Sequence, residues 1–145
     1  MENKKYKLTN ETIKVYDKTL YRIEALKDFS DMCKGDKGGF IEDEHNLSHD
    51  GNSWVYGNAM VYGNGMVYGD AKIENNSDYI VFKNWWSSGR FFTWTRSNDM
   101  WSVGCFYGSG EELIKKAYED SEKSGREYER VVKYVEEIRK EYGNK

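Results

Sequence analysis

The sequence has few cysteines, few histidines and no long apolar run. Its two cysteines, Cys33 and Cys105, lie far apart and form no CxxC pair, so we expect both to be reduced and to serve as packing residues. No apolar stretch approaches the length of a membrane span, and the first residues, MENKKYKLTNE, lack the apolar stretch of a signal peptide. A cytoplasmic protein is therefore expected.

An excess of basic residues is also missing. The formal net charge is -3, which argues against a general polyanion binder, so we expect no extended nucleic acid as a partner. The chain has 145 residues, of which 38% are hydrophobic and 32% are charged. A chain of this size and composition can bury one core and is not disordered. One soluble domain without a membrane partner is indicated.

A six-residue repeat occupies the middle of the chain. From Val55 the units read VYGNAM, VYGNGM and VYGDAK, and Ile73 follows. The branched residue that opens each unit suits an inward strand position, and the Gly-Asn or Gly-Asp pair tolerates the positive φ of a corner. The frame extends back to Ile41 and Leu47, which makes six units. Because three units close a triangular coil, the repeat predicts about two coils.

This pattern resembles the left-handed parallel β-helix of hexapeptide-repeat proteins. The resemblance implies a mainly β fold, a short left-handed parallel β-helix with an N-terminal β cap and a C-terminal α+β module. We expect a cap at 1-38, the repeat at 39-78, an aromatic-rich three-stranded meander at 79-108 and a helical hairpin at 109-145, all in one compact unit. Two coils bury little, so the prism must be capped or joined to copies of itself.

Longer stretches carry a second resemblance. YRIEALKDFSD and KGDKGGFIEDEHNLSHDGNSWVYGNA are similar to the N-terminal part of small hexapeptide-repeat proteins of bacteriophages and prophages, some of which are described as acyltransferases. WSVGCFYGSGEELIKKAYEDSEKSGREYERVVKYVEEI resembles a C-terminal module of the same phage proteins. The resemblance implies a phage accessory protein in the cytoplasm of a host bacterial cell.

The acyltransferase resemblance draws attention to His45 and His49, the only histidines. Hexapeptide acyltransferases use a histidine as general base, with acyl-CoA along several coils, and this repeat is short for that cofactor. Asp43, Glu44 and Asp50 lie beside the histidines in sequence, so a metal site is a second interpretation. We favour solvated loop residues instead, and we expect no catalytic residue, no metal and no cofactor.

The repeat also predicts a belt of large side chains that point outward. Side chains alternate along a strand, so the residues next to the inward valines face out. Such a belt is larger than a soluble monomer usually exposes, and part of it should be covered by the same chain or by another subunit. The resemblance adds that these prisms commonly trimerise. We expect a homo-oligomer, most simply a trimer, whose interface holds Tyr56, Met60, Tyr62, Met66 and Tyr68.

Aromatic residues and arginines crowd the stretch 79–107. The segments YIVFKN, RFFTWTR and MWSVGCFY predict an antiparallel meander, with Phe92 and Trp94 on one face and Thr93 and Thr95 on the other. A ring can stack on a nucleobase while a guanidinium pairs with phosphate. The alternative is that these rings form a core against the prism and the helices. The candidate ligand-binding residues are Trp85, Trp86, Arg90, Trp94, Arg96 and Trp101.

Two capping boxes predict two C-terminal helices. Ser109 precedes Glu112 by three residues, and Ser124 precedes Glu127 in the same way. Each following segment carries an apolar stripe at helical spacing, so a helical hairpin is expected to pack on the aromatic sheet or on a neighbouring subunit.

Three functions remain open at this point. The sequence shows no nucleophile beside a base and no phosphate loop, which favours binding over catalysis. The leading hypothesis is a non-catalytic anti-defence protein that sequesters a nucleotide-type immune signal or inhibits a host defence protein that makes or senses it. The alternatives are acyl transfer by His45 or His49 and a structural or assembly component of the phage. The expected partner is thus a nucleotide-like small molecule or a host protein.

Overall fold

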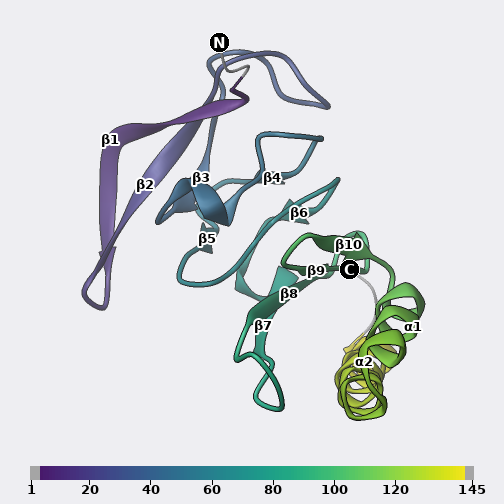
Figure 1. Ribbon diagram of the computed structural model, residues 1–145. Coiled ribbons are helices and arrows are strands. Elements are labelled where there is room, and N and C mark those ends of the chain that lie inside the picture. Colours follow the sequence, from purple (N-terminus) through teal and green to yellow (C-terminus); the bar gives the residue numbers. More distant parts are fainter. Residues whose placement is uncertain (1–3, 143–145) are drawn as a thin grey trace.

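The computed structural model describes residues 4–142. Figure 1 shows a long N-terminal hairpin, a middle segment of short strands, and a second sheet with two helices against it. The first sheet has the order β1-β2-β3-β5, antiparallel except for the parallel β3–β5 pair. Its strands are β1 (Tyr6–Val15), β2 (Lys18–Ala25), β3 (Lys37–Ile41) and β5 (Met60–Val61).

The repeat forms very short strands joined by tight corners. β4 (Trp54–Val55) pairs in parallel with β6 (Lys72–Ile73), and Leu47 forms a parallel bridge with Val67. Two 3₁₀ helices, η1 (Glu44–Asn46) and η2 (Asn76–Asp78), flank this segment. The predicted corner glycines all have positive φ, at 58° for Gly57 and 66° for both Gly63 and Gly69. The sequence therefore located the corners correctly.

The prediction of a left-handed parallel β-helix is wrong. The described residues form antiparallel and mixed sheets with two C-terminal helices, and they contain no closed or solenoid sheet. The reason lies in strand length. β4, β5 and β6 have only two residues each, whereas β1 and β2 have ten and eight. Most backbone pairing therefore belongs to antiparallel hairpins, and the repeat contributes only isolated parallel pairs between them.

The inward positions of the repeat were nevertheless identified correctly. Their side chains have no solvent exposure, and they join residues of the N-terminal hairpin in one apolar cluster. Tyr6 and Ile23 come from the hairpin, and Trp54 comes from β4. The repeat residues of this cluster include Ile41, Leu47, Val55, Val61, Val67 and Ile73. The N-terminal strands thus pack against the repeat.

The second sheet has the order β10-β9-β8-β7 and is antiparallel throughout. Its strands are β7 (Tyr79–Lys83), β8 (Phe91–Thr95), β9 (Met100–Val103) and β10 (Phe106–Gly108). The predicted meander is present, but its third stretch divides at Gly104, where φ is 57°, so a fourth strand forms. The helices α1 (Gly110–Asp120) and α2 (Glu122–Tyr142) follow as an adjacent pair (Figure 1).

The predicted division of β8 into two faces is confirmed. Phe92 and Trp94 are buried in a second apolar cluster that also contains Leu113 of α1 and Val132 of α2. On the other face, the Oγ1 atom of Thr93 accepts a hydrogen bond of 3.0 Å from the backbone N–H of Met66 in the repeat. The second sheet therefore lies between the repeat and the helices.

One predicted helix cap is confirmed and the other is wrong. Ser109 Oγ accepts from the Glu112 N–H at 3.2 Å, and the Glu112 carboxylate accepts from the Ser109 N–H at 2.9 Å, as a capping box requires. Ser124 lies inside α2. Ser121 takes the capping position instead, because its Oγ accepts from the Ser124 N–H at 3.0 Å. The two helices meet there with a single residue between them.

Both cysteines are free and exposed. The expectation that Cys33 and Cys105 are packing residues is therefore wrong, since each lies in a turn at the surface. Within residues 4–142, no helix is long and apolar enough to cross a membrane.

Candidate functional site

The six sequence-predicted binding residues do not form one site. The rings of Trp86, Trp94 and Trp101 are buried in the second apolar cluster. For these three residues the structure therefore agrees with the alternative interpretation, in which the aromatic rings form a core. Trp85 is 66% exposed and touches Trp86 edge to face, with ring centroids 5.7 Å apart. The two arginines separate, since Arg90 and Arg96 line two different clefts.

The cleft beside Arg90, which we call the α1 cleft, lies between the second sheet and the start of the helical pair. It has a volume of about 500 Å³, within the usual range of small-molecule sites of roughly 300–1,000 Å³. The loop after β7 and the strands β9 and β10 form one side, and α1 and the first turns of α2 form the other. The residues with a hydroxyl group in its lining are Ser87, Ser88, Ser121, Ser124 and Tyr128.

Asn84 lies in the α1 cleft and is only 6% exposed. It directly follows β7, and its backbone N–H donates to the Arg90 carbonyl at 2.8 Å, which closes the loop between β7 and β8. Its Nδ2 donates to the Tyr128 hydroxyl at 3.4 Å, but no described residue donates to its Oδ1. A buried polar atom without a partner costs roughly 1–3 kcal/mol of stability. Such an atom in a native protein needs an explanation, and a ligand in the cleft would supply the missing partner.

Two cations border the same cleft. The Arg90 guanidinium lies so close over Gly104 that a Cβ at that position would overlap it, which explains why the β9–β10 turn has glycine there. Lys116 approaches from α1. Among the described residues, neither cation forms an ion pair, and Asp120 is the single acidic residue of the lining. The cleft therefore offers two unpaired positive charges to an anion.

Tyr128 lines the same cleft and is buried. The pKa of Tyr128 is raised above its usual value, chiefly by burial and to a small extent by Asp120. The contact with Asn84 and the positive charge of Arg90 oppose this rise. The ring is held edge-on by Trp86 at 4.9 Å between centroids. The Trp86 indole N–H in turn donates to Ser124 at 3.2 Å. Tyr128 therefore presents a neutral hydroxyl at a fixed position.

A second cleft of about 410 Å³ lies between β7, β8 and the end of α2. It is lined by Trp94 and Arg96, together with Tyr79 and Tyr142. Asp99 supports one wall, because its Oδ1 accepts from the Trp94 indole at 2.8 Å and its Oδ2 pairs with Arg139 at 2.6 Å. The lining of this cleft is more apolar than that of the α1 cleft, and Trp94 beside it is only 1% exposed.

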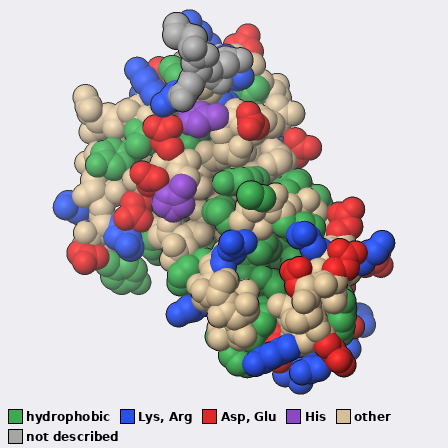
Figure 2. All heavy atoms as spheres, viewed as in Figure 1, with side chains coloured by type: hydrophobic (Ala, Val, Ile, Leu, Met, Phe, Trp, Pro, Cys, Tyr) green, Lys and Arg blue, Asp and Glu red, His purple; other side chains and the backbone are tan. Residues whose placement is uncertain are grey.

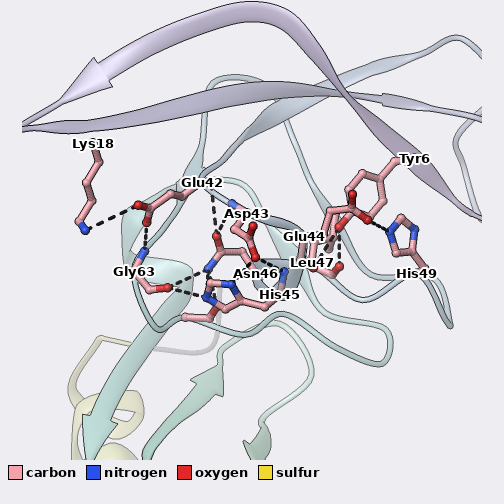
Figure 3. A network of polar contacts seen from close by, with 11 residues as sticks. Tyr6, Lys18, Glu42, Asp43, Glu44, His45, Asn46, Leu47, His49 and Gly63 are labelled. Atoms are coloured by element: carbon pink, nitrogen blue, oxygen red, sulfur yellow. Dashed lines mark hydrogen bonds and ion pairs between the residues drawn. The ribbon is translucent and has the colours of Figure 1, made fainter.

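The histidines belong to a polar network around η1, drawn in Figure 3. His49 Nε2 lies 2.8 Å from the Glu44 carboxylate, and its Nδ1 accepts from the Lys5 N–H at 3.1 Å. The ring also stacks on Tyr6 at 4.1 Å. Both ring nitrogens of His49 are thus occupied, and no lone pair is left for a general base.

His45 is held in a similar way. Its Nδ1 lies 2.7 Å from Asp43 Oδ2, and its Nε2 lies 2.7 Å from the Gly63 carbonyl. Both partners are acceptors, so the doubly protonated ring satisfies them best, and the bond to Asp43 raises the pKa of His45. Figure 2 shows both histidines on one face beside acidic side chains. This geometry gives the acyl-transfer hypothesis no free base.

The predicted belt of outward residues is partly covered by the chain itself. Its five members, Tyr56, Met60, Tyr62, Met66 and Tyr68, are all half-buried. The Tyr79 hydroxyl of β7 donates to the Met60 carbonyl at 3.1 Å, and the Tyr56 hydroxyl donates to Asp31 at 3.0 Å. A homo-oligomer, with a trimer as its expected form, stays a prediction for these residues.

Within the described part of the chain, no group of three or more His, Cys, Asp or Glu side chains is arranged to hold a metal ion. No protein-family model matches the chain, and no curated protein matches it. Of the residues that line the α1 cleft, sequence reasoning proposed Arg90 alone as a ligand-binding residue. The one sequence feature that could also have pointed to this cleft is Asn84, a polar residue directly after an apolar strand.

Proposed function

We propose that this protein acts by binding a small anionic molecule of the nucleotide type in the α1 cleft. The observation that carries the proposal is the combination of the unpaired cations Arg90 and Lys116 with the buried, unpartnered Oδ1 of Asn84 in one cleft of about 500 Å³. Guanidinium and ammonium groups suit phosphate. The hydroxyl-rich walls suit a sugar and other polar groups.

The resemblance of the sequence to phage proteins supports a role for this binding in an infected bacterial cell. Capture of a nucleotide-type immune signal in the host cytoplasm would lower its free concentration and blunt the defence that depends on it. The protein would then act without turnover, as a sequestering protein of a phage. The free cations of the α1 cleft favour a small anion over a host protein as the captured partner.

Isothermal titration of the purified protein with AMP, GMP, CMP and UMP tests the proposal. We expect at least one of them to bind with a Kd below about 100 μM, equivalent to more than about 5 kcal/mol. Arg90→Ala and Lys116→Ala should each weaken that binding at least about tenfold, because a hydrogen bond to a charged group contributes roughly 1.5–3 kcal/mol.

Lys115→Ala is the matched control. Lys115 is the exposed neighbour of Lys116 on α1 and does not line the cleft. Its removal takes away the same charge from the same helix and should leave the affinity unchanged. Failure of all four nucleotides to bind at about 1 mM overturns the proposal, since ordinary cleft affinities lie well below that concentration. Equal losses in Lys115→Ala and Lys116→Ala also overturn it.

A further inference from the structure

The floor of the α1 cleft identifies a more specific ligand class, and this step rests on the proposed function. The side chains of Asn84 and Tyr128 are 6% exposed each, and both line the cleft. They lie in hydrogen-bond contact with each other, with Asn84 Nδ2 and Tyr128 Oη 3.4 Å apart. Each still has hydrogen-bonding capacity that no described residue uses.

The two unused groups are one hydrogen-bond acceptor and one hydrogen-bond donor. Asn84 Oδ1 accepts no hydrogen bond from a described residue. The Tyr128 oxygen accepts from Asn84, so its own hydrogen is free to be donated. An unused acceptor and an unused donor therefore lie on two neighbouring residues that both line the cleft. If the amide is turned over, its nitrogen lies unpaired instead, so Asn84 has one unsatisfied polar atom in either orientation.

We propose that Asn84 and Tyr128 read the edge of a nucleobase while Arg90 and Lys116 hold its phosphate. Every nucleobase has a ring edge on which an N–H donor lies beside a nitrogen or oxygen acceptor. That edge matches the acceptor of Asn84 and the donor of Tyr128. A ligand that has a phosphate but lacks a base can bind the two cations, but it leaves the Asn84–Tyr128 pair unsatisfied. Asn84 is thus the specificity-determining residue of the site.

The neighbours of this pair support such a role. Trp86 contacts the Tyr128 ring edge-on and is itself anchored, because its indole N–H donates to Ser124. The Asn84 backbone is bonded on both sides, since its N–H donates to Arg90 and its carbonyl accepts from Gly89 at 2.9 Å. Both side chains are therefore held in place before a ligand arrives, and pre-organisation of this kind strengthens binding.

The test compares two probes on two proteins. The probes are the tightest-binding nucleoside 5′-monophosphate and ribose 5-phosphate, which has the same sugar and phosphate but no base. Wild-type protein should bind the nucleotide at least about tenfold more tightly, a difference of about 1.4 kcal/mol. Asn84→Leu should remove most of that preference while its affinity for ribose 5-phosphate stays unchanged.

Stability supplies the second measurement. Asn84→Leu keeps a similar shape and removes the unpaired buried oxygen together with the 3.4 Å hydrogen bond to Tyr128, so the two effects oppose each other and the melting temperature without ligand should change little. A residue kept only for structure would instead show a lower melting temperature and equal losses for both probes. Equal binding of nucleotide and ribose 5-phosphate by wild-type protein overturns the base-reading inference while the proposed function stands. Failure of both probes to bind overturns the proposed function itself.

Discussion

The Tyr118 ring of α1 lies directly against the backbone of Gly125 in α2, so closely that a Cβ on Gly125 would overlap the ring. The Tyr118 hydroxyl donates to Glu129 at 2.7 Å, which holds the ring across the helix. Glycine inside a helix is otherwise unfavourable by about 1 kcal/mol relative to alanine. Gly125 therefore allows the close approach of α1 and α2, and that approach shapes the α1 cleft.

Gly125→Ala should lower the free energy of unfolding by about 1–3 kcal/mol, as overpacking does. In a Tyr118→Ala background the ring is gone, and the same substitution should stabilise the protein by up to about 1 kcal/mol through helix propensity. Urea unfolding of the four proteins of this cycle measures both effects. The same sign in both backgrounds would contradict the contact between the two residues.

Gly39→Ala should destabilise the repeat. A Cβ on Gly39 would overlap the Ala59 carbonyl and stand 2.7 Å from Val55 Cγ1, and a backbone oxygen cannot move aside cheaply. We expect a loss of about 1–3 kcal/mol in unfolding free energy. Gly57→Asn is the control, because Gly57 has a φ of 58° and open space around it. Asparagine tolerates that conformation, so this variant should lose much less.

Lys5 should make the free energy of unfolding vary with pH in the alkaline range. Its ammonium is fully buried, donates to the Ser53 carbonyl at 2.7 Å and lies over the Phe29 ring. Burial, helped by Lys27 and opposed by Asp50 and Asp70, lowers the pKa of Lys5 to about 8 from its ordinary 10.5. Between these two values the unfolded chain binds more protons than the folded protein, so stability should rise with pH there.

Urea unfolding of wild-type protein and Lys5→Met across that pH window checks this prediction. The wild-type free energy of unfolding should rise relative to the variant as pH increases from about 8 to 10.5. Parallel curves for the two proteins would show that the ammonium keeps its ordinary pKa in the folded state.

Asp43 and His45 make stability depend on pH more weakly than Lys5 does, and their contribution falls as pH rises above 6.5 instead of increasing. The bond between them raises the pKa of His45 and lowers that of Asp43. The pair therefore stabilises the fold fully between the ordinary values of 3.8 and 6.5, and its contribution fades as pH rises through the raised pKa of His45. Both side chains are at least half exposed, so the contribution is below about 1 kcal/mol.

Asp43→Asn tests this pair, because asparagine still caps η1 but carries no charge. The difference in unfolding free energy between wild-type protein and the variant should be largest near about pH 5, roughly midway in this window, and should narrow as pH rises above it. A gap that is constant from about pH 5 to pH 8 would show that His45 does not titrate with Asp43 in the folded protein.

Local features of this protein could be predicted from sequence where a short pattern determines them. The inward position of Val61, the positive φ of Gly63 and the capping box at Ser109 all follow from neighbouring residues. The fold class could not be predicted in this way, because the repeat pattern does not show how few residues of each unit form backbone pairs with another strand. The long pairing of β1 with β2 and of β7 with β8 determines the sheets instead.

The α1 cleft was hidden from sequence for a different reason. Asn84, Lys116 and Tyr128 come from a loop and two helices, and the distances between them along the chain carry no pattern. The tryptophans of the same region gave a misleading signal, because aromatic rings that build a core and rings that stack on a ligand have the same composition. Only the burial of Trp94 and Trp101 separates the two interpretations.

Backbone NMR with the tightest-binding nucleoside 5′-monophosphate tests the central claim most directly, because amide chemical shifts report where a ligand lies. We predict that the perturbed amides cluster around Asn84, Arg90, Gly104 and the end of α1. Perturbations confined to the cleft of Arg96 and Tyr142, or to η1 with its two histidines, would contradict the assignment of the α1 cleft as the binding site.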